Sequence, residues 1–291
     1  MKQEHWGAVY LTLAASIWGG MYVVSKYALD TIPPFTFLFI RYLLAFVLLA
    51  AICWSNGTNI IPAKNRKLLL QIGFIGYFLS IAAQFVGTKL STAHMGAVIT
   101  TLSPIFLSVF AIILLKEKLS RHQLAAMVLA TIGVVIVLDP GQMTMKAGSD
   151  LLGKLVLLIA AISWGYYSVL ARKASSEFSS LQITTCAILV AGVVDIPFVF
   201  MEAGSWSFQA LFSLPIIGSI LYVGFISTAL AFFCWNKGLS LLPAHQAGPF
   251  FFFQPVVGTI LSWLVLKESI TGGFFVGGLF IIVGVYLNMR E

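Results

Sequence analysis

The chain has 291 residues, of which 59% are hydrophobic and 9% are charged, and its net charge is +7. Soluble domains carry about a quarter charged residues, so this composition excludes an ordinary soluble protein. The mean hydropathy is +0.98, and the apolar residues form long continuous runs, which predict membrane-spanning helices rather than the alternating strands of a barrel. Basic residues lie in short clusters between the runs, a pattern typical of membrane topology and not of a nucleic-acid-binding surface.

Ten apolar segments follow one another along the chain, and most reach the length of about 20 residues that a spanning helix needs. In chain order they are Gly7–Leu29, Pro33–Trp54, Leu68–Val86, Thr92–Leu115, Gln123–Leu138, Leu151–Ala171, Ser179–Met201, Pro215–Trp235, Ala244–Leu266 and Gly272–Met289. The longest connections are Ser55–Lys67 and Asp139–Asp150. We therefore predict an all-α integral membrane protein with ten transmembrane helices.

The second half of the chain repeats the skeleton of the first. A shift of 151 residues aligns Ala93 and His94 with Ala244 and His245, Pro104 with Pro255, Leu115 to Glu117 with Leu266 to Glu268, and Gly133 with Gly284. A shift of 146 residues aligns Trp18 and Gly19 with Trp164 and Gly165. We predict two five-helix repeats, residues 1–145 and 146–291. Because five is odd, the second repeat enters the membrane from the opposite face, and inverted repeats of this kind place a substrate site near the midplane in transporters.

Short motifs carry a resemblance to one family. They are Ala-Ser-Ile-Trp-Gly-Gly at 15–20, Arg-Tyr-Leu-Leu-Ala at 41–45, Ser-Pro at 103–104 followed by Leu-Leu-Lys-Glu-Lys at 114–118, and Gln-Pro at 254–255 followed by Leu-Lys-Glu-Ser at 266–269. In this order, over essentially the whole chain, they resemble the ten-span EamA-type branch of the drug/metabolite transporter superfamily. The resemblance implies a secondary transporter, usually an exporter of amino acids or other small metabolites, whose third, fourth, eighth and ninth spans line a central cavity.

The basic residues predict the orientation. Alternate loops carry the clusters Lys64 to Lys67, Lys116 to Arg121, Arg172 with Lys173, and Lys237. By the positive-inside rule these loops and both termini face the cytoplasm of a multi-pass plasma-membrane protein. The three cysteines lie inside apolar runs, and the sequence contains no Walker motif and no metal-ligand spacing. No disulfide framework, metal, cofactor or direct use of ATP is therefore expected.

Asp195 in the seventh predicted span is the only carboxylate well inside a span, and Arg41 in the second is the only arginine there. At 1.5 Å per residue they lie about 12 and 9 Å from the same membrane face, so they are able to pair. A charge at the centre of the bilayer costs at least about 2.5 kcal/mol unless it finds a partner or water. Two interpretations stay open, a structural salt bridge and a pair that binds protons or substrate. For Arg41, extension outward to the interface is a further alternative.

Other residues are candidates for lining the cavity, and each has an alternative as a packing, interfacial or interhelical residue. Pro104 and Pro255 lie inside the fourth and ninth spans, where proline frees a backbone carbonyl. His94 and His245 begin these two spans, and histidine titrates near neutral pH. The remaining candidates are mid-span aromatic residues and uncharged polar residues, namely Trp18, Gln84, Thr101, Trp164, Asn236, Phe252 and Gln254.

We expect a secondary active transporter that exports small metabolites, with amino acids or related compounds as the leading class, by alternating access and with proton coupling. A passive facilitator or an importer is the alternative within transport. A lipid-modifying enzyme would need catalytic groups clustered on facing helices, and one aspartate with scattered histidines does not supply them, so no enzymatic activity is expected. The expected partners are the small-molecule substrate, protons and the lipid bilayer, with no nucleic acid.

Overall fold

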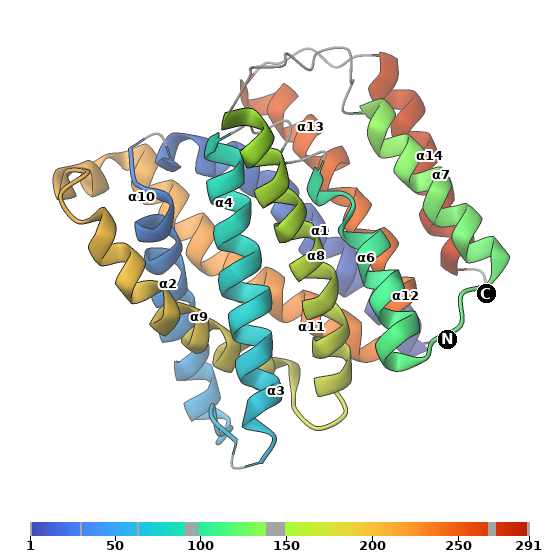
Figure 1. Cartoon of the computed structure of the whole chain (residues 1–291), viewed down its shortest axis with the longest axis horizontal. Coiled ribbons are helices and arrows are strands. Elements are labelled where there is room, and N and C mark those ends of the chain that lie inside the picture. Colours follow the sequence, from blue (N-terminus) through green and yellow to red (C-terminus); the bar gives the residue numbers. More distant parts are fainter. Residues whose placement is uncertain are drawn as a thin grey trace.

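The computed structural model describes residues 2–29, 31–62, 64–90, 96, 99–137, 149–266 and 272–289. Within these ranges the regular structure is helical and includes no strand (Figure 1), which confirms the all-α prediction for this part of the chain. The helices are α1 (Lys2–Leu29), α2 (Pro34–Ser55), α3 (Arg66–Gln71), η1 (Ile72–Leu79), α4 (Ser80–Leu90), α6 (Ser103–Phe110), η2 (Ala111–Leu115), α7 (Arg121–Val137), α8 (Ser149–Ala174), α9 (Ser180–Glu202), η4 (Phe208–Phe212), α10 (Leu214–Leu221), η5 (Tyr222–Leu230), α11 (Ala231–Leu241), α12 (Ala244–Ala247), η6 (Gly248–Phe252), α13 (Phe253–Leu266) and α14 (Gly272–Met289).

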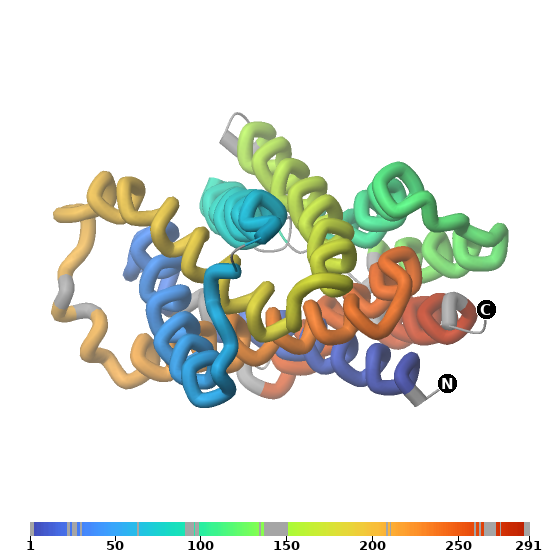
Figure 2. Tube along the Cα trace, turned by 90° about the horizontal axis from the view of Figure 1, so that it is seen from below, coloured from blue at the N-terminus to red at the C-terminus, as the bar shows by residue number. Residues whose placement is uncertain are grey.

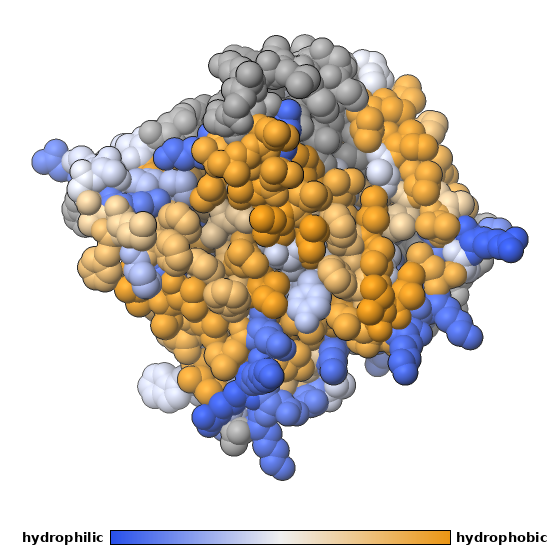
Figure 3. Space-filling model, viewed as in Figure 1, coloured by the Kyte–Doolittle hydropathy of each residue, from blue (hydrophilic) through white to orange (hydrophobic). Residues whose placement is uncertain are grey.

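Five helical stretches are long and apolar enough to cross a membrane: Pro34–Ser55, Arg66–Leu90, Leu151–Ala174, Ser180–Glu202 and Leu214–Leu241. Apart from Pro197 in α9, their prolines lie in the first turn, where the helix needs no backbone N–H. Hydrophobic residues cover the middle of the face seen in Figure 3, and hydrophilic residues gather along its margins. These features are those of a multi-pass membrane protein.

The two halves of the chain are interleaved rather than set side by side. Helix α4 of the first half packs on α8 of the second half, and α1 of the first half packs on both α11 and α13 of the second. Seen from below, blue and cyan helices accordingly alternate with yellow and red ones (Figure 2). Both halves therefore contribute to the interior of the molecule.

The predicted ninth span, Ala244–Leu266, is not one helix. It is divided into α12, the 3₁₀ segment η6 and α13, because Pro249 and Pro255 each remove a backbone donor. Pro255 lies in the first turn of α13, and Pro104 lies in the first turn of α6. Both prolines therefore lie inside the predicted spans at points where a new helix begins, and not within one continuous helix.

Close approaches between helices occur in pairs that repeat the offsets seen in the sequence. Gly73 in η1 lies against Val190 in α9, and Gly224 in η5 lies against Leu44 in α2. Gly224 follows Gly73 by 151 residues, and Val190 follows Leu44 by 146. One contact is thus the counterpart of the other with the halves exchanged.

A second pair of contacts has the same relation. Gly19 in α1 lies against Gly258 in α13, and Gly165 in α8 lies against Leu107 in α6. A side chain on Gly19 would place its Cβ only 2.5 Å from the carbonyl oxygen of Gln254. Glycine is needed here because the two backbones are almost in contact.

Hydrogen bonds connect several of the basic loops at one end of the molecule. Asn65 donates to the carboxylate of Glu177, which joins the loop before α3 to the loop after α8. Arg172 donates to the carbonyl oxygen of Leu239 at 3.0 Å, which joins the end of α8 to the end of α11. Three of the segments that carry the predicted cytoplasmic charges are therefore joined to one another.

Candidate functional site

A small buried cavity lies between helices of both halves. Residues of α1, α2, α4, α6 and the segment before α6 line it from the first half, and residues of α8, α11, η6 and α13 line it from the second. Its volume is about 20 Å³, which is room for one or two waters. A metabolite can therefore enter only when the surrounding side chains move.

Aromatic rings form most of the apolar wall. Trp18 and Trp164 meet edge to face with their ring centroids 5.0 Å apart. The ring centroid of Phe232 lies 5.3 Å from that of Trp18, and the ring centroid of Phe251 lies 5.7 Å from that of Trp164. The two indole N–H groups differ, because Trp18 donates to the carbonyl of Ser227 at 2.9 Å, whereas the buried Nε1 of Trp164 has no hydrogen-bond partner among the described residues.

Arg41 brings a positive charge from α2 to the cavity, and only 1% of the residue is exposed. Its Nε donates to the hydroxyl of Thr228 at 2.8 Å, and one terminal nitrogen lies 3.8 Å from the sulfur of Met21. The guanidinium also lies 5.6 Å from the ring centroid of Tyr42. The sequence left Arg41 and Asp195 able to pair, and the structure shows no ion pair between them.

Asp195 lies on α9, is fully buried and does not line the cavity. Neither of its carboxylate oxygens has a hydrogen-bond partner among the described residues. Buried polar groups are nearly always hydrogen-bonded, so a side chain that lacks a partner calls for an explanation. The structure thus separates the two intramembrane charges into two sites.

Equivalent positions of the two halves contribute to the lining of the cavity. Its lining includes the pair Trp18 and Trp164, which are 146 residues apart, and the pairs Ile81 and Phe232, Thr100 and Phe251, and Ser103 and Gln254, each 151 residues apart. The tryptophan pair also matches in chemistry, whereas Ser103 corresponds to an amide and Thr100 to an aromatic ring. The buried Oε1 of Gln254 has no hydrogen-bond partner among the described residues.

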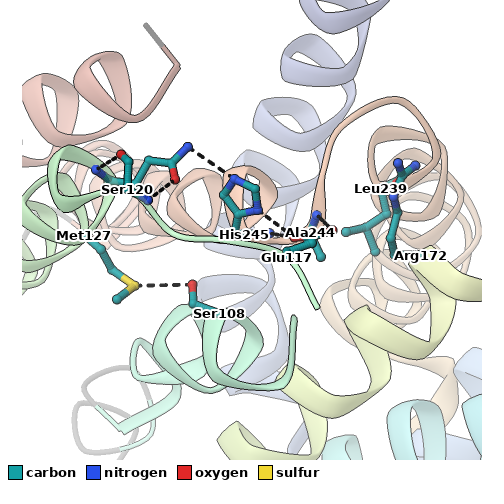
Figure 4. Close-up of polar contacts among 9 residues, drawn as sticks. Ser108, Glu117, Ser120, Met127, Arg172, Leu239, Ala244 and His245 are labelled. Carbon is teal, nitrogen blue, oxygen red and sulfur yellow. Dashed lines mark hydrogen bonds and ion pairs between the residues drawn. The ribbon is translucent and has the colours of Figure 1, made fainter. Parts of the chain in front are cut away.

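A second polar cluster, which we call the Glu117 cluster, comprises Glu117, Gln123, Ala244 and His245. Figure 4 shows Glu117, Ala244 and His245 close together. Glu117, from the loop between η2 and α7, accepts hydrogen bonds of 3.1 Å from the backbone N–H groups of Ala244 and His245. Its carboxylate also lies 2.6 Å from Nδ1 of His245, whose Nε2 lies 3.2 Å from the amide of Gln123. The cluster joins the loop after the fourth predicted span to the beginning of the ninth.

Two opposing effects act on the carboxyl group of Glu117. Partial burial alone would raise its pKa, but the hydrogen bonds from His245 and Ala244 outweigh burial and hold the pKa below its usual value. Glu117 is therefore ionised over the physiological range. A negative charge at this helix start is also favoured because the first backbone N–H groups of a helix have no carbonyl partner within the helix.

Comparison with known proteins identifies the family. The profile of the EamA-like transporter family matches residues 5–139 and, a second time, residues 151–290. The chain belongs to the EamA-like transporter family.

Relatives of this EamA-like transporter extend along its whole length. An uncharacterized transporter of Bacillus subtilis, YetK, is 28% identical over 300 residues, which cover 99% of this chain and 88% of the relative. A probable amino-acid metabolite efflux pump of Salmonella typhimurium is 26% identical over 95% of this chain and 92% of its own. A solved crystal structure shares the fold, with a TM-score of 0.84 at 17% identity and 98% of both chains covered.

Some residues predicted from the sequence do meet at the cavity of this EamA-like transporter. They are Trp18, Arg41, Gln84, Trp164 and Gln254. The prediction missed Met21, Ser80, Ile81, Thr100, Ser103, Ala160, Phe232 and Phe251. The 151-residue offset was a signal that could have found Ser103, because this residue is the counterpart of Gln254.

Other predicted residues lie elsewhere. Thr101 and Phe252 are buried but do not line the cavity. Their chain neighbours Thr100 and Phe251 line it instead. Pro104 and Pro255 begin helices next to the cavity without lining it. His245 belongs to the Glu117 cluster, and His94 lies outside the described residues.

Asn236 was also predicted to line the cavity, but the structure places it in a separate hydrogen-bonded network. Its Nδ2 donates to the hydroxyls of Tyr77 and Thr184, and its Oδ1 accepts from the hydroxyl of Tyr167, all at 2.9 Å. Tyr42 in turn donates to the carbonyl of Tyr77. We call these five residues the Asn236 network, and its bonds tie α2, η1, α8, α9 and α11 together.

Proposed function

We propose that this EamA-like transporter exports small metabolites, with amino acids or related compounds as the substrate class, across the plasma membrane by secondary active transport. The observation that carries the proposal is the small buried cavity, whose lining combines equivalent positions from both halves. A relative that is similar over nearly the whole chain is named a probable amino-acid metabolite efflux pump. That name supports both the direction and the substrate class.

In this proposal the chain consists of two inverted five-helix repeats, residues 1–145 and 146–291, which together cross the membrane ten times. The family profile matches the chain twice, once in each of these ranges. The π-helical segments η1 and η5 occupy equivalent positions in the third and eighth predicted spans, and the glycine contacts occur in exchanged pairs. Two halves that make equivalent contacts can exchange conformations, which is the basis of alternating access.

The Glu117 cluster closes one side of the molecule in this mechanism. It lies among the basic loops, so in our proposal it faces the cytoplasm together with both termini. Glu117 belongs to the first repeat and His245 to the second, so the bonds between them must break when the repeats separate on this side. Substrate then reaches the cavity once Trp18 and Trp164 move apart.

Proton coupling is assigned to Asp195. Its carboxyl group is fully buried and has no hydrogen-bond partner among the described residues, so proton transfer to it breaks no existing bond. A buried charge without a partner is costly in a membrane, so the protonated and ionised forms of Asp195 differ in free energy. Such a difference is what a proton gradient needs in order to drive transport.

Flux measurements in proteoliposomes test the proposal. Vesicles that contain the purified protein are loaded with a labelled mixture of amino acids, amines and neutral metabolites, and a pH gradient is applied and then removed. We expect amino-acid efflux that the gradient accelerates in the wild type and not in Asp195→Asn. Gradient-independent efflux would indicate a facilitator, uptake against the gradient an importer, and the absence of any flux would contradict transport.

A further inference from the structure

Arg41 stands out in the proposed transport cavity because it is a buried cation without an anion. Its recorded neighbours are the hydroxyl of Thr228, the sulfur of Met21 and the rings of Tyr42 and Phe85. All four are neutral, and no carboxylate of the described residues lies within ion-pairing distance. Burying a charge in this way costs several kcal/mol unless a partner restores what water supplied.

The carboxylates of the neighbouring helix α9 do not provide that partner. Glu202 accepts hydrogen bonds from the backbone N–H groups of Phe35 and Thr36 and from the Thr36 hydroxyl, at 2.7 to 3.1 Å. Asp195 accepts none and makes no ion pair with Arg41. The guanidinium therefore keeps donors that no described side chain uses, because Nε and one terminal nitrogen account for its recorded bonds.

The second half of the chain supplies two further unused groups to the same cavity. Among the residues that the structure describes, the buried Nε1 of Trp164 is a donor without an acceptor, and the buried Oε1 of Gln254 is an acceptor without a donor. Each residue is only 6% exposed, so bulk water does not reach it freely. Leaving a buried polar group unpaired costs about 1–3 kcal/mol, and a bound molecule would remove that cost.

These three groups describe a ligand by its chemistry. A carboxylate is the anion whose two oxygens match a guanidinium, and it can accept from an indole N–H as well. The carbonyl oxygen of Gln254 requires an N–H or O–H donor on the same molecule. The rings of Trp18, Phe232 and Phe251 complete an apolar wall around this polar set.

We infer that Arg41 is the carboxylate-binding residue of the cavity, and that the substrate is a small monocarboxylate that also carries a hydrogen-bond donor. The inference rests on the proposed transport function and deepens it, because it assigns the discrimination between solutes to one charge. Amines, amides and esters that lack the carboxylate leave Arg41 unpaired and are rejected. The zwitterionic α-amino acids are the simplest molecules that satisfy all three groups.

Binding to the purified full chain in detergent tests the inference without requiring transport. The twenty proteinogenic L-amino acids are screened by tryptophan fluorescence, since Trp18 and Trp164 line the cavity. The tightest of them is then compared with its methyl ester, its amide and its decarboxylated amine. We expect affinity to fall at least tenfold when the carboxylate is esterified, amidated or removed.

Variants of Arg41 locate the effect. Arg41→Gln keeps a donor for Thr228 but removes the charge, and we expect it to bind the acid and its ester within twofold of each other. Arg41→Lys keeps the charge but lacks the planar guanidinium that can bind both oxygens of a carboxylate, so an intermediate preference for the acid is expected. Arg121→Gln, which changes an exposed arginine outside the cavity, is the matched control and keeps the wild-type preference.

The outcomes separate the inference from the proposed function. Equal wild-type affinity for acid and ester, or efflux of amines and neutral solutes but of no carboxylate from the proteoliposomes, would overturn the inference and leave transport standing. Carboxylate-selective binding without flux would support the inference and contradict the proposed function. If Arg41→Gln fails to fold, the wild-type ligand series and Arg41→Lys still decide the question.

Discussion

Two buried polar regions lie within the same bundle and differ in how completely they are hydrogen-bonded. In the Asn236 network the amide of Asn236 makes three bonds of 2.9 Å to Tyr77, Tyr167 and Thr184. In the cavity, Trp164 and Gln254 each bury a polar atom that has no partner in the described part of the chain, and Arg41 has no anion there. The network is complete without a ligand, and the cavity is not.

The difference teaches which region is structural and which binds. Groups that satisfy one another rigidify a core and have no bonding capacity left for a ligand. Groups that remain unpaired in a buried place are costly, and they persist where a molecule from outside completes them. Polarity inside a membrane protein is therefore not in itself a sign of a substrate site. The useful sign is an unused donor or acceptor.

The largest loss of stability is expected at two glycines where helices next to the cavity pack most closely. In Gly19→Leu the new side chain meets the backbone of Gln254 and Gly258, and in Gly165→Leu it meets the backbone of Leu107. Each change should cost about 3 kcal/mol or more, measured as thermal unfolding and as monodisperse yield. Gly218→Leu is the control because no atom lies within 4 Å of its Cβ position. Wild-type stability in both cavity variants would show that the walls are not rigid.

The second-largest loss of stability is expected when the Asn236 network is broken. Asn236→Leu removes three hydrogen bonds and leaves the hydroxyls of Tyr77 and Tyr167 with fewer partners, so we expect a loss of about 2 kcal/mol. Denaturation of the purified protein in detergent measures the loss. An unchanged free energy of unfolding would mean that the network contributes no stability and that the comparison with the cavity fails.

The Glu117 cluster should give a smaller effect that depends on pH. Glu117→Gln weakens the bonds to Ala244 and His245 and should cost about 1 kcal/mol at neutral pH. Because folding lowers the pKa of Glu117, its contribution is present above the usual carboxyl range and is lost as pH falls through the lowered value. Melting temperatures of wild type and variant should therefore converge in acid. A gap that widens in acid would contradict the assigned bonds.

The smallest effect on stability is expected at the cavity itself. Gln254→Leu removes an oxygen that has no hydrogen-bond partner within the described ranges. The free energy of unfolding should therefore change by less than about 0.5 kcal/mol, or the protein should become slightly more stable. Substrate flux should nevertheless fall at least tenfold, because a hydrogen bond to the ligand is lost. Stability and flux measured on the same preparation distinguish this result from misfolding. A variant with wild-type flux would remove Gln254 from the site.

Several features could be predicted from the sequence because they depend on local composition. Apolar runs predict helices, and identical residues at two fixed offsets predict a duplicated chain whose halves make equivalent contacts. Polar residues in mid-span, such as Arg41 and Gln254, could be selected as candidates because each is rare in lipid. The hydrogen-bond partners of such residues could not be predicted. Asn236 and Gln254 are both amides in apolar helices, and only one of them is fully hydrogen-bonded.

Sequence alone determined the helical fold class, the family and the duplication of this protein, because these depend on which residues follow one another. Tertiary structure alone decided which side chains reach the cavity. Thr101 and Phe252 were predicted, whereas Thr100 and Phe251 line it, and these two errors are the same error at equivalent positions. One residue along a helix turns the side chain by about 100°. The rotation of each helix is fixed by the contacts it makes with others, among them the glycine contacts, and no local pattern records them.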